Sequence, residues 1–325
     1  MVASLGDPYT VYLDKKANQA LADQLKGKLS GIGIEVGIKN NHLTVIAPIE
    51  GTPAAKAGLR AGDVIAAVDG QDTGSMTVDD AVNKIRGSKG TPVKLTIVRA
   101  GNSPQEITVV RDDITVPSVT YKMYPNGVGY IKISTFGQNT ITDVQNAVTS
   151  LNSQGAKAVI VDVRGNPGGY LDGAVSISSQ FMSSGVVVEE KSRTGENKKL
   201  TAIAGGDMTS IPVIMLVDGG SASASEIMAG ALHDNGRATL VGEKTFGKGS
   251  VQEIICLSGF NLSSNCPDDA LKVTIAHWYT PNGINISKEG IKPDVEVKIT
   301  QDQINAGQDP QLQKALELAT QKLAQ

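Results

Sequence analysis

The sequence predicts an α/β core accompanied by a small β-rich domain, and the patterns along the chain carry this prediction. From about residue 128 onward, segments with strand character alternate with segments of helical period, which is typical of an α/β layered core. Two of the strands, at residues 158–163 and 211–217, are nearly continuous apolar runs, as expected for strands buried on both faces. Ahead of them, residues 29–113 hold short strands bounded by turn signals, which indicate a separate β-rich domain.

A chain of 325 residues is long enough for about two domains, each with its own hydrophobic core. We expect a lead segment at residues 1–28 with a helix at 15–25, the β-rich domain at 29–113, the α/β core at 114–300 and a helical tail at 301–325. Within the core we expect strands at 128–133, 158–163, 211–217 and 273–279 and helices at 142–151, 173–182 and 223–232. In the β-rich domain, Thr52 and Pro53 predict a capped short helix.

Bulk properties exclude several functional classes. The net charge of −3 gives no electrostatic case for nucleic acid or for an anionic membrane surface. No apolar run approaches the ~20 residues of a membrane-spanning helix. Residues 1–5 have neither the basic nor the apolar region of a signal peptide. The chain contains no HExxH motif, no carboxylate cluster with metal-ligand spacing and no phosphate-binding loop of the P-loop kind, so we expect no metal and no cofactor.

The most informative residues are Ser223 and Lys248. Ser223 lies in GGSASASE at residues 219–226, where an apolar strand and a glycine turn precede a helix. Free backbone N–H groups at a helix N-terminus favour negative charge that develops in a reaction. Lys248 stands between two glycines in an apolar stretch, where burial disfavours the charged amine and makes it a base near neutral pH. A serine nucleophile with a desolvated lysine is the working pair of a Ser–Lys hydrolase.

Histidine is the usual alternative base, but none of the three in the chain fits this role. His233 lies about 15 Å from Ser223 along the same predicted helix, too far for a hydrogen bond. His42 falls in the β-rich domain, and His277 lies on a predicted strand, where a packed or edge side chain is the simpler interpretation. No His–Asp pair stands out in the sequence, so the lysine remains the expected base.

Several strings in the chain resemble those of the C-terminal processing peptidases, the tail-specific S41-type serine proteases. They are GDPYT at residues 6–10, VRGNPGG at 163–169, GSASASE at 220–226, GEKTFGKGSVQ at 242–252, YTPNG at 279–283 and GIKPD at 290–294. The resemblance covers nearly the whole chain, and its strings occur in the family's order. It implies a ClpP/crotonase-like core, a PDZ domain and a serine endopeptidase that recognises the C-terminal tail of protein substrates, often with small or apolar end residues.

The resemblance places the nucleophile at the middle serine, Ser223, rather than at Ser221 or Ser225, and the base at Lys248 rather than Lys244. Gln252 either orients the neutral amine, if it shares a strand face with Lys248, or is an ordinary strand residue.

An oxyanion hole needs two N–H donors. Ala224, directly after the nucleophile, is the first candidate, and Gly168, with Gly169 as the alternative, is the second; the loop that carries them is otherwise only a tight turn. Asn166 is expected to shape this loop, and Glu226 to support the start of the helix rather than to catalyse.

The run Gly31, Ile32, Gly33 and Ile34 resembles the carboxylate-binding loop of PDZ domains. Successive backbone N–H groups in such a loop form a nest for a peptide C-terminus, and the following strand edge pairs with the peptide. Arg86, at the end of a predicted helix, is either a solvated helix-end cation or a basic contact near this groove.

The resemblance also sets expectations on location and assembly. The family usually acts outside the cytoplasm, with an export or anchor segment and helices ahead of its GDPYT string, and neither precedes that string here, so we expect a trimmed, extracytoplasmic protein. Its activity and oligomeric state, and any regulatory partner, stay open. Cys256 and Cys266 either form a disulfide across a polar loop at 258–265, worth about 2–3 kcal/mol, or are free thiols.

Two rival functions belong to other classes. A non-catalytic peptide-binding scaffold would not need Ser223 or Lys248, and both are present. A crotonase-like acyl-CoA enzyme would need neither this pair nor a peptide-binding domain.

Overall fold

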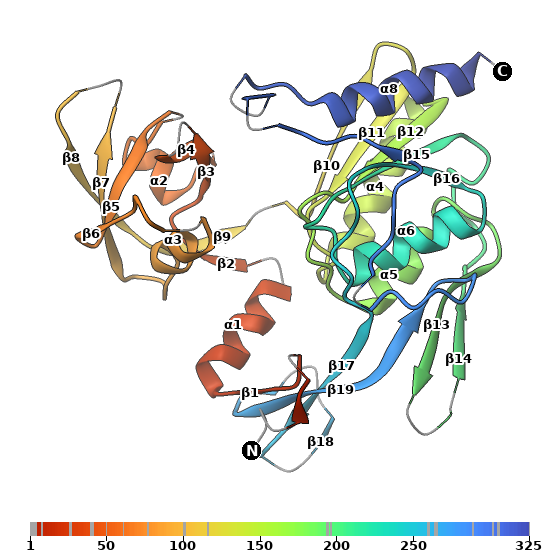
Figure 1. Ribbon diagram of the computed structural model, residues 1–325, viewed down its shortest axis with the longest axis horizontal. Helices are drawn as coiled ribbons and strands as arrows, with labels where there is room; N and C mark the ends of the chain where they lie inside the picture. Colours follow the sequence, from red (N-terminus) through yellow and green to blue (C-terminus); the bar gives the residue numbers. More distant parts are fainter. Residues whose placement is uncertain are drawn as a thin grey trace. The chain divides into compact units, whose positions relative to one another are not determined.

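The computed structural model has two compact units, which are described separately (Figure 1). The larger unit comprises residues 1–27, 117–299 and 309–325, and the smaller comprises 28–116 and 300–308. The structure describes residues 5–7, 9–25, 28–39, 42–49, 51–60, 62–76, 78–99, 102–115, 117–192, 195, 197–258, 261–262, 266–287, 289–300, 302–303 and 306–324.

The smaller unit is a β-rich domain built on one mixed-length antiparallel sheet. Its elements are β2 (Lys28–Gly31), β3 (Ile34–Lys39), β4 (His42–Pro48), α2 (Pro53–Lys56), β5 (Val64–Val68), β6 (Gln71–Asp72), α3 (Val78–Ile85), β7 (Pro92–Val98), β8 (Gln105–Val110) and β9 (Asp112–Thr115). The sheet has the order β3-β4-β5-β7-β8, with β6 on β5, and β2 pairs separately with β9. Alternate residues of β7, among them Val93, Leu95 and Ile97, point into its core. This domain confirms the predicted β-rich part of the chain.

The short helix predicted at Thr52 and Pro53 is present as α2, with Pro53 in its first turn, but the predicted capping bond is not formed. Thr52 precedes α2 but makes no side-chain capping bond. Its hydroxyl instead donates to the carbonyl oxygens of Gly33 (3.1 Å) and Ile49 (2.6 Å). Thr52 therefore fixes the glycine loop ahead of β3, a long-range partner that helix-start signals do not report.

The larger unit is centred on a mostly parallel sheet of order β10-β11-β12-β15-β16-β20, in which only β10 runs antiparallel to its neighbour. The strands of this sheet are β10 (Val119–Tyr124), β11 (Val128–Ile133), β12 (Ala158–Asp162), β15 (Val213–Val217), β16 (Ala238–Gly242) and β20 (Val295–Glu296). The helices on it are α4 (Thr140–Ser153), α5 (Leu171–Ser178), α6 (Ala224–Asp234) and α8 (Pro310–Leu323).

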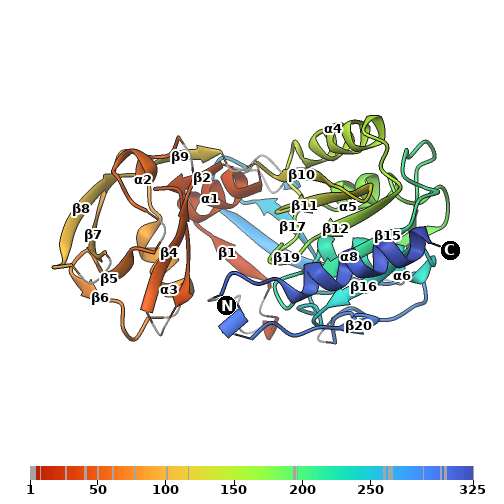
Figure 2. The same cartoon turned by 90° about the horizontal axis from the view of Figure 1, so that it is seen from above.

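Helices cover both faces of this sheet, which explains its continuous apolar runs. On β12, Val159 and Val161 pack into the core formed with α4, α5 and α6, whereas Ala158 and Ile160 pack into the core formed with α8. Figures 1 and 2 show α8 and α4 on opposite faces of the sheet. The predicted α/β core is therefore confirmed, and α8 is an integral layer of it.

A second, antiparallel sheet of the larger unit has no counterpart in the sequence predictions beyond one strand. Its order is β14-β13-β19-β17-β18, and β1 pairs with β19. Its strands are β1 (Val11–Leu13), β13 (Val186–Ser192), β14 (Asn197–Thr201), β17 (Ser250–Cys256), β18 (Asn261–Leu262) and β19 (Ala270–Tyr279). The polar and apolar residues of β17 and β19 are half-buried without clear alternation, so period-two patterning is weak there.

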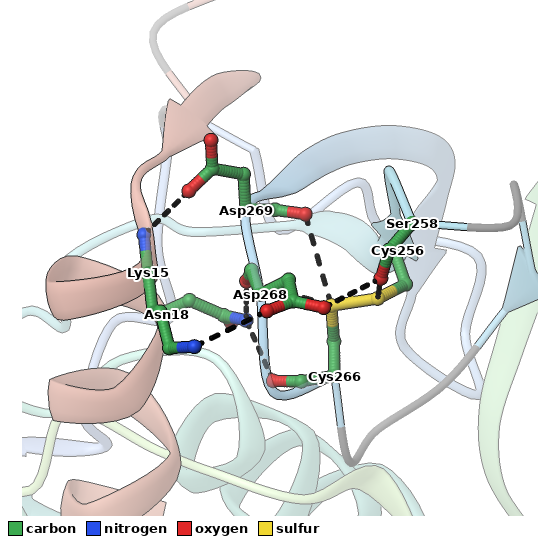
Figure 3. The surroundings of a disulfide bond; sticks show 7 residues. All are labelled: Lys15, Asn18, Cys256, Ser258, Cys266, Asp268 and Asp269. Atoms are coloured by element: carbon green, nitrogen blue, oxygen red, sulfur yellow. Dashed lines mark hydrogen bonds and ion pairs between the residues drawn. A yellow bond between two sulfur atoms is a disulfide. The ribbon is translucent and has the colours of Figure 1, made fainter.

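A disulfide joins Cys256, at the end of β17, to Cys266 (Figure 3). Of the polar loop predicted at 258–265, residues 259–260 and 263–265 lie outside the described residues. The bonded hairpin holds α1 (Lys15–Leu25), because Asn18 Nδ2 donates to the carbonyl oxygens of Cys266 (2.9 Å) and Asp268 (2.8 Å). The neighbouring Asp269 carboxylate accepts from the Tyr12 hydroxyl at 2.6 Å. The lead segment is thereby fixed to the second sheet.

Within the described part of the chain, none of the helices has both the length and the apolar character needed to span a membrane.

Candidate active site

Ser223 stands at the tip of a strained turn between β15 and α6. Its φ of 54° and ψ of −114° place a non-glycine residue in the left-handed half of backbone space. Such strain is costly and persists at sites where the surroundings impose it. Gly168 supplies part of that constraint, since a Cβ there would lie 2.8 Å from the Ser223 Cβ and 2.7 Å from the Ala222 carbonyl oxygen.

The three competing serines have different environments. The Ser221 hydroxyl is fully buried and donates to the Val163 carbonyl oxygen at 2.8 Å. The Ser225 hydroxyl is also fully buried and donates to the Asn166 carbonyl oxygen at 2.9 Å. The Ser223 hydroxyl is half-buried and donates to no acceptor among the described residues; its oxygen is on the accepting side of a capping box with the Glu226 N–H. Ser223 is thus the one of these three serines whose hydroxyl hydrogen is not held by a backbone carbonyl.

The two competing lysines also differ. Lys244 is exposed, whereas Lys248 is half-buried and precedes β17. The flanking glycines have separate roles: Gly247 has a φ of +91°, and a Cβ on Gly249 would clash with the backbone of Ser287. Both features allow the Lys248 loop to approach the rest of the site closely.

Glu226, on the first turn of α6, ties the Lys248 loop to the Ser223 turn. Its carboxylate is fully buried. One oxygen accepts from the backbone N–H groups of Ser223 and Lys248, both at 2.9 Å. The other accepts from the Thr245 hydroxyl at 2.6 Å and from the Gly247 N–H at 2.7 Å. Glu226 therefore supports the start of α6, as predicted, and it also anchors the loop that carries Lys248.

Ser223, Lys248 and Gln252 line one cavity of about 620 Å³, together with Gly168, Gly169 and Lys272. Its apolar wall includes Leu21, Leu171, Ile254 and Trp278. No hydrogen bond joins the Ser223 hydroxyl to the Lys248 amine among those that the described residues form. The cavity is large enough to admit a peptide side chain beside the pair.

Burial lowers the pKa of Lys248 below its ordinary value of 10.5. The positive charge of Lys272 lowers it further, and Glu226 opposes both effects. Nothing in the sequence marks Lys272, because only the pairing of β17 with β19 brings it to the cavity, opposite Ile254. The net effect favours a neutral amine at Lys248, as a general base requires.

Gln252 reaches the cavity by a different route from the one predicted. β17 begins only at Ser250, and a register shift between Val251 and Gln252 interrupts its alternation, so Lys248 and Gln252 do not share a face by simple periodicity. The Gln252 Nε2 donates to the hydroxyls of Ser250 (2.7 Å) and Thr274 (3.3 Å).

The candidate oxyanion donors lie together, but one of them is engaged. The Gly168 N–H donates to Asn166 Oδ1 at 2.8 Å. The N–H groups of Ala224 and Gly169 donate to no acceptor among the described residues. Asn166 is fully buried and also donates from Nδ2 to the Ile133 carbonyl oxygen, in keeping with its predicted loop-shaping role.

His233 is paired with carboxylates, contrary to the sequence interpretation that no His–Asp pair stands out. Its Nδ1 lies 2.9 Å from Asp234 Oδ1 and its Nε2 3.2 Å from Asp294 Oδ1. Burial lowers the pKa of His233, but the two carboxylates outweigh this and raise it overall. His233 does not line the cavity that holds Ser223, so the pairing belongs to the far end of α6.

In the smaller unit, the predicted carboxylate-binding loop lines a cavity of about 180 Å³. Its lining includes Gly31, Ile32, Gly33, Ile34 and Arg86. The strand that follows the loop, β3, is at the edge of its sheet and leaves one side open for pairing with a peptide. The Arg86 side chain is exposed, and its Cγ would lie 3.9 Å from a Cβ on Gly31.

No cluster of three or more histidine, cysteine or acidic side chains that could hold a metal ion occurs in the described ranges.

The similarity of this chain to known proteins extends over both of its parts. The model of Peptidase family S41 matches residues 127–297, and that of the PDZ domain matches residues 20–98. The carboxy-terminal-processing protease of Bartonella bacilliformis is 41% identical over 304 residues, covering 92% of this chain and 68% of the relative. The CtpA protease of Bacillus subtilis is 37% identical, with 92% and 62% covered, and the carboxyl-terminal-processing protease of Synechocystis is 40% identical, with 98% and 75% covered.

Solved structures of S41-type proteases also resemble this chain. The photosystem II D1 C-terminal processing protease superposes with a TM-score of 0.62 at 31% identity, covering 92% of this chain and 80% of that chain. A putative S41 protease from Bacteroides fragilis superposes with a TM-score of 0.67 at 18% identity and therefore speaks for the fold alone. The chain belongs to peptidase family S41, a family of serine proteases, and carries a PDZ domain.

Proposed function

We propose that this protein is an endopeptidase that binds the C-terminal tail of protein substrates through its PDZ domain and cleaves them by a Ser223–Lys248 mechanism. The observation that carries the proposal is the contrast among candidate groups. Of Ser221, Ser223 and Ser225, only Ser223 has a hydroxyl that donates to no carbonyl oxygen among the described residues. It stands on a strained turn and shares a cavity with the half-buried Lys248.

In the proposed reaction, neutral Lys248 accepts the proton of the Ser223 hydroxyl as the oxygen attacks the scissile carbonyl. The oxyanion of the tetrahedral intermediate binds the N–H of Ala224 and that of Gly169. Gly168 joins them only if its N–H leaves Asn166. Collapse of the intermediate breaks the C–N bond, and Lys248 returns the proton to the leaving amine. Water then hydrolyses the acyl-enzyme on Ser223 by the same proton route.

The PDZ domain selects the substrate in this proposal. The loop at Gly31–Ile34 receives the terminal carboxylate, β3 pairs with the tail, and Arg86 adds a positive charge beside the loop. The disulfide between Cys256 and Cys266 supports action in an oxidising, extracytoplasmic compartment, because such bonds are rare in the cytosol.

Tail recognition predicts a dependence on the free carboxylate. A substrate protein with an apolar C-terminus should be cleaved with a kcat/KM about 10-fold higher than the same protein with an amidated terminus, because hydrogen bonds to a charged group contribute about 1.5–3 kcal/mol. Arg86→Ala should shrink this ratio. Lys84→Ala, at a neighbouring exposed lysine, is the matched control and should preserve it.

Cleavage by the parent and not by Ser223→Ala, with equal rates on the free and amidated termini, would reject tail recognition and leave the peptidase proposal standing. Cleavage that survives in Ser223→Ala would reject the mechanism itself. If the protein were a non-catalytic scaffold, the parent and Ser223→Ala would both bind the tail, and neither would cleave the free or the amidated substrate.

The lysine base predicts a rising pH–rate profile. Lys248 is inactive when protonated, so kcat should rise as the pH passes upward through its lowered pKa. Lys272→Met removes a repulsive charge, which raises the pKa of Lys248 and should move the rising limb to higher pH. Lys199→Met, an exposed lysine of β14, serves as the control. If the rising part of the pH–rate profile stays at the same pH in Lys272→Met, the charge of Lys272 does not affect the pKa of Lys248.

A further inference from the structure

Residues 6–7 and 9–10, from the GDPYT string, lie against β19, more than half the chain away in sequence. Thr274 donates its backbone N–H to Thr10 Oγ1 at 3.0 Å, and β1 continues the contact by pairing Val11 with Lys272. The Asp7 carboxylate accepts from the Thr10 hydroxyl at 2.5 Å and from the Tyr9 N–H at 3.1 Å. Asp7, Tyr9 and Thr10 are therefore held together by hydrogen bonds beside the second sheet, and this group is called the Asp7 turn.

A hydrogen-bond relay leads from this turn to Gln252. The Thr274 hydroxyl lies near the Asp7 carboxylate, where it lowers the pKa of that group, and it accepts from Gln252 Nε2 at 3.3 Å. Thr274 and Gln252 face each other across the β17–β19 pair. Burial raises the pKa of Asp7, but the bonds from Thr10, Thr274 and the backbone outweigh this and lower it overall, so the group is a carboxylate near neutral pH.

The chemistry of the relay fixes the direction of each bond. A carboxylate only accepts, so the single hydrogen of the Thr274 hydroxyl goes to Asp7. The hydroxyl can then only accept from Gln252, which forces the amide NH₂ toward Thr274. Ser250 Oγ takes a second bond from the same Nε2 at 2.7 Å. The Gln252 carbonyl oxygen is thereby left for the cavity that it shares with Lys248.

A second residue of the same turn reaches Lys248 directly. The Tyr9 ring lies with its centroid 5.5 Å from the Lys248 Nζ. A flat ring at this distance limits where the amine can move. The turn thus approaches Lys248 through Tyr9 and reaches Gln252 through Thr274.

We propose that Asp7 is a positioning residue for catalysis: through Thr274 it fixes the amide of Gln252 so that the carbonyl oxygen holds the Lys248 amine toward Ser223. The inference rests on the Ser223–Lys248 mechanism proposed above and adds the lead segment to it. If Asp7 had only a structural role, it would hold the turn together without orienting the Gln252 amide. Its replacement would then leave kcat unchanged, whereas loss of a positioning role lowers kcat.

Asp7→Asn tests the role, because an asparagine can present its own NH₂ to Thr274. The Thr274 hydroxyl can then reverse and donate to Gln252, which turns the amide around. We expect kcat for a tail-bearing peptide to fall about 10- to 100-fold, with KM changed less than 2-fold, as for misplacement of a reacting group. Asp14→Asn is the matched control: Asp14 caps α1 by accepting from the Ala17 N–H, a role asparagine can fill, and its kcat should equal that of the parent.

A double-mutant cycle separates the relay from general damage. Thr274→Val should reproduce the loss in kcat, Thr274→Ser should restore it, and Asp7→Asn/Thr274→Val should lose no more than either single change. Losses that multiply in the double variant, or a kcat for Asp7→Asn equal to that of Asp14→Asn, would overturn the proposal. Ser223→Ala in the same assay keeps the questions apart, since residual cleavage there rejects the mechanism and not the role of Asp7 alone.

Discussion

Replacing Lys248 with methionine should lower kcat for peptide cleavage by about 10³-fold while the protein stays folded. General bases contribute about 10²- to 10⁴-fold to rates, and in the proposed mechanism this lysine both takes the Ser223 proton and returns it to the leaving amine. Methionine is unbranched and apolar, so it suits a half-buried position whose surroundings already disfavour charge. Initial rates on a tail-bearing peptide, read beside the melting temperature, give the result.

Lys244→Met is the matched control, since Lys244 lies four residues before Lys248 in the sequence and its side chain is exposed. Its kcat should remain within about 2-fold of the parent, because surface substitutions away from a site have small effects. If both lysine variants lose activity equally, the loss reflects the loop as a whole and not a base at position 248.

Exchanging Glu226 for glutamine should have the second largest effect, and it should be felt in both stability and catalysis. The carboxylate accepts four hydrogen bonds, two at each oxygen. A glutamine NH₂ cannot accept, so two of the four donors lose their partner, at a cost of about 1–3 kcal/mol each. We expect the free energy of unfolding to fall by about 2 kcal/mol or more and kcat to fall about 10²-fold, because the Ser223 turn and the Lys248 loop lose their common anchor.

Glu289→Gln is the control for this change, since Glu289 is exposed on the same unit. Denaturant unfolding and kinetics on the same samples measure the two effects. A Glu226→Gln variant that loses stability but keeps the parental kcat would show that the carboxylate holds the fold together without positioning the reacting groups.

Local patterns predicted the parts of the fold that depend on local physics. β11 has the predicted bounds, and β12 and β15 lie within their predicted ranges, because apolar residues between turn signals define a buried strand. The N-terminus of α6 was predictable for a similar reason, since strand, glycine turn and small residues lie consecutively in the sequence. The proposed nucleophile and the proposed lysine base were therefore selected from short strings of residues, aided by a family resemblance.

What escaped prediction depends on contacts between distant segments. The second sheet brings together β1, β17 and β19, and its half-buried strands alternate poorly. Lys272 and the Asp7–Thr274 contact exist only once that sheet has formed. The hydrogen bond from the Gly168 N–H to Asn166 also escaped prediction, because it depends on the folded conformation of the loop at residues 164–169 and not on the presence of glycines there.

The most direct test of the Ser223–Lys248 pair is to locate a covalent adduct. The parent, Ser223→Ala and Lys248→Met are each treated with an alkyl fluorophosphonate, which traps an activated serine, and the modified peptide is identified by mass spectrometry. We expect a single adduct on Ser223 in the parent, forming faster as the pH rises through the pKa of Lys248, none in Ser223→Ala, and labelling slower by about 10²-fold or more in Lys248→Met. An adduct on Ser221 or Ser225, or labelling of Lys248→Met at the parental rate, would contradict the assignment.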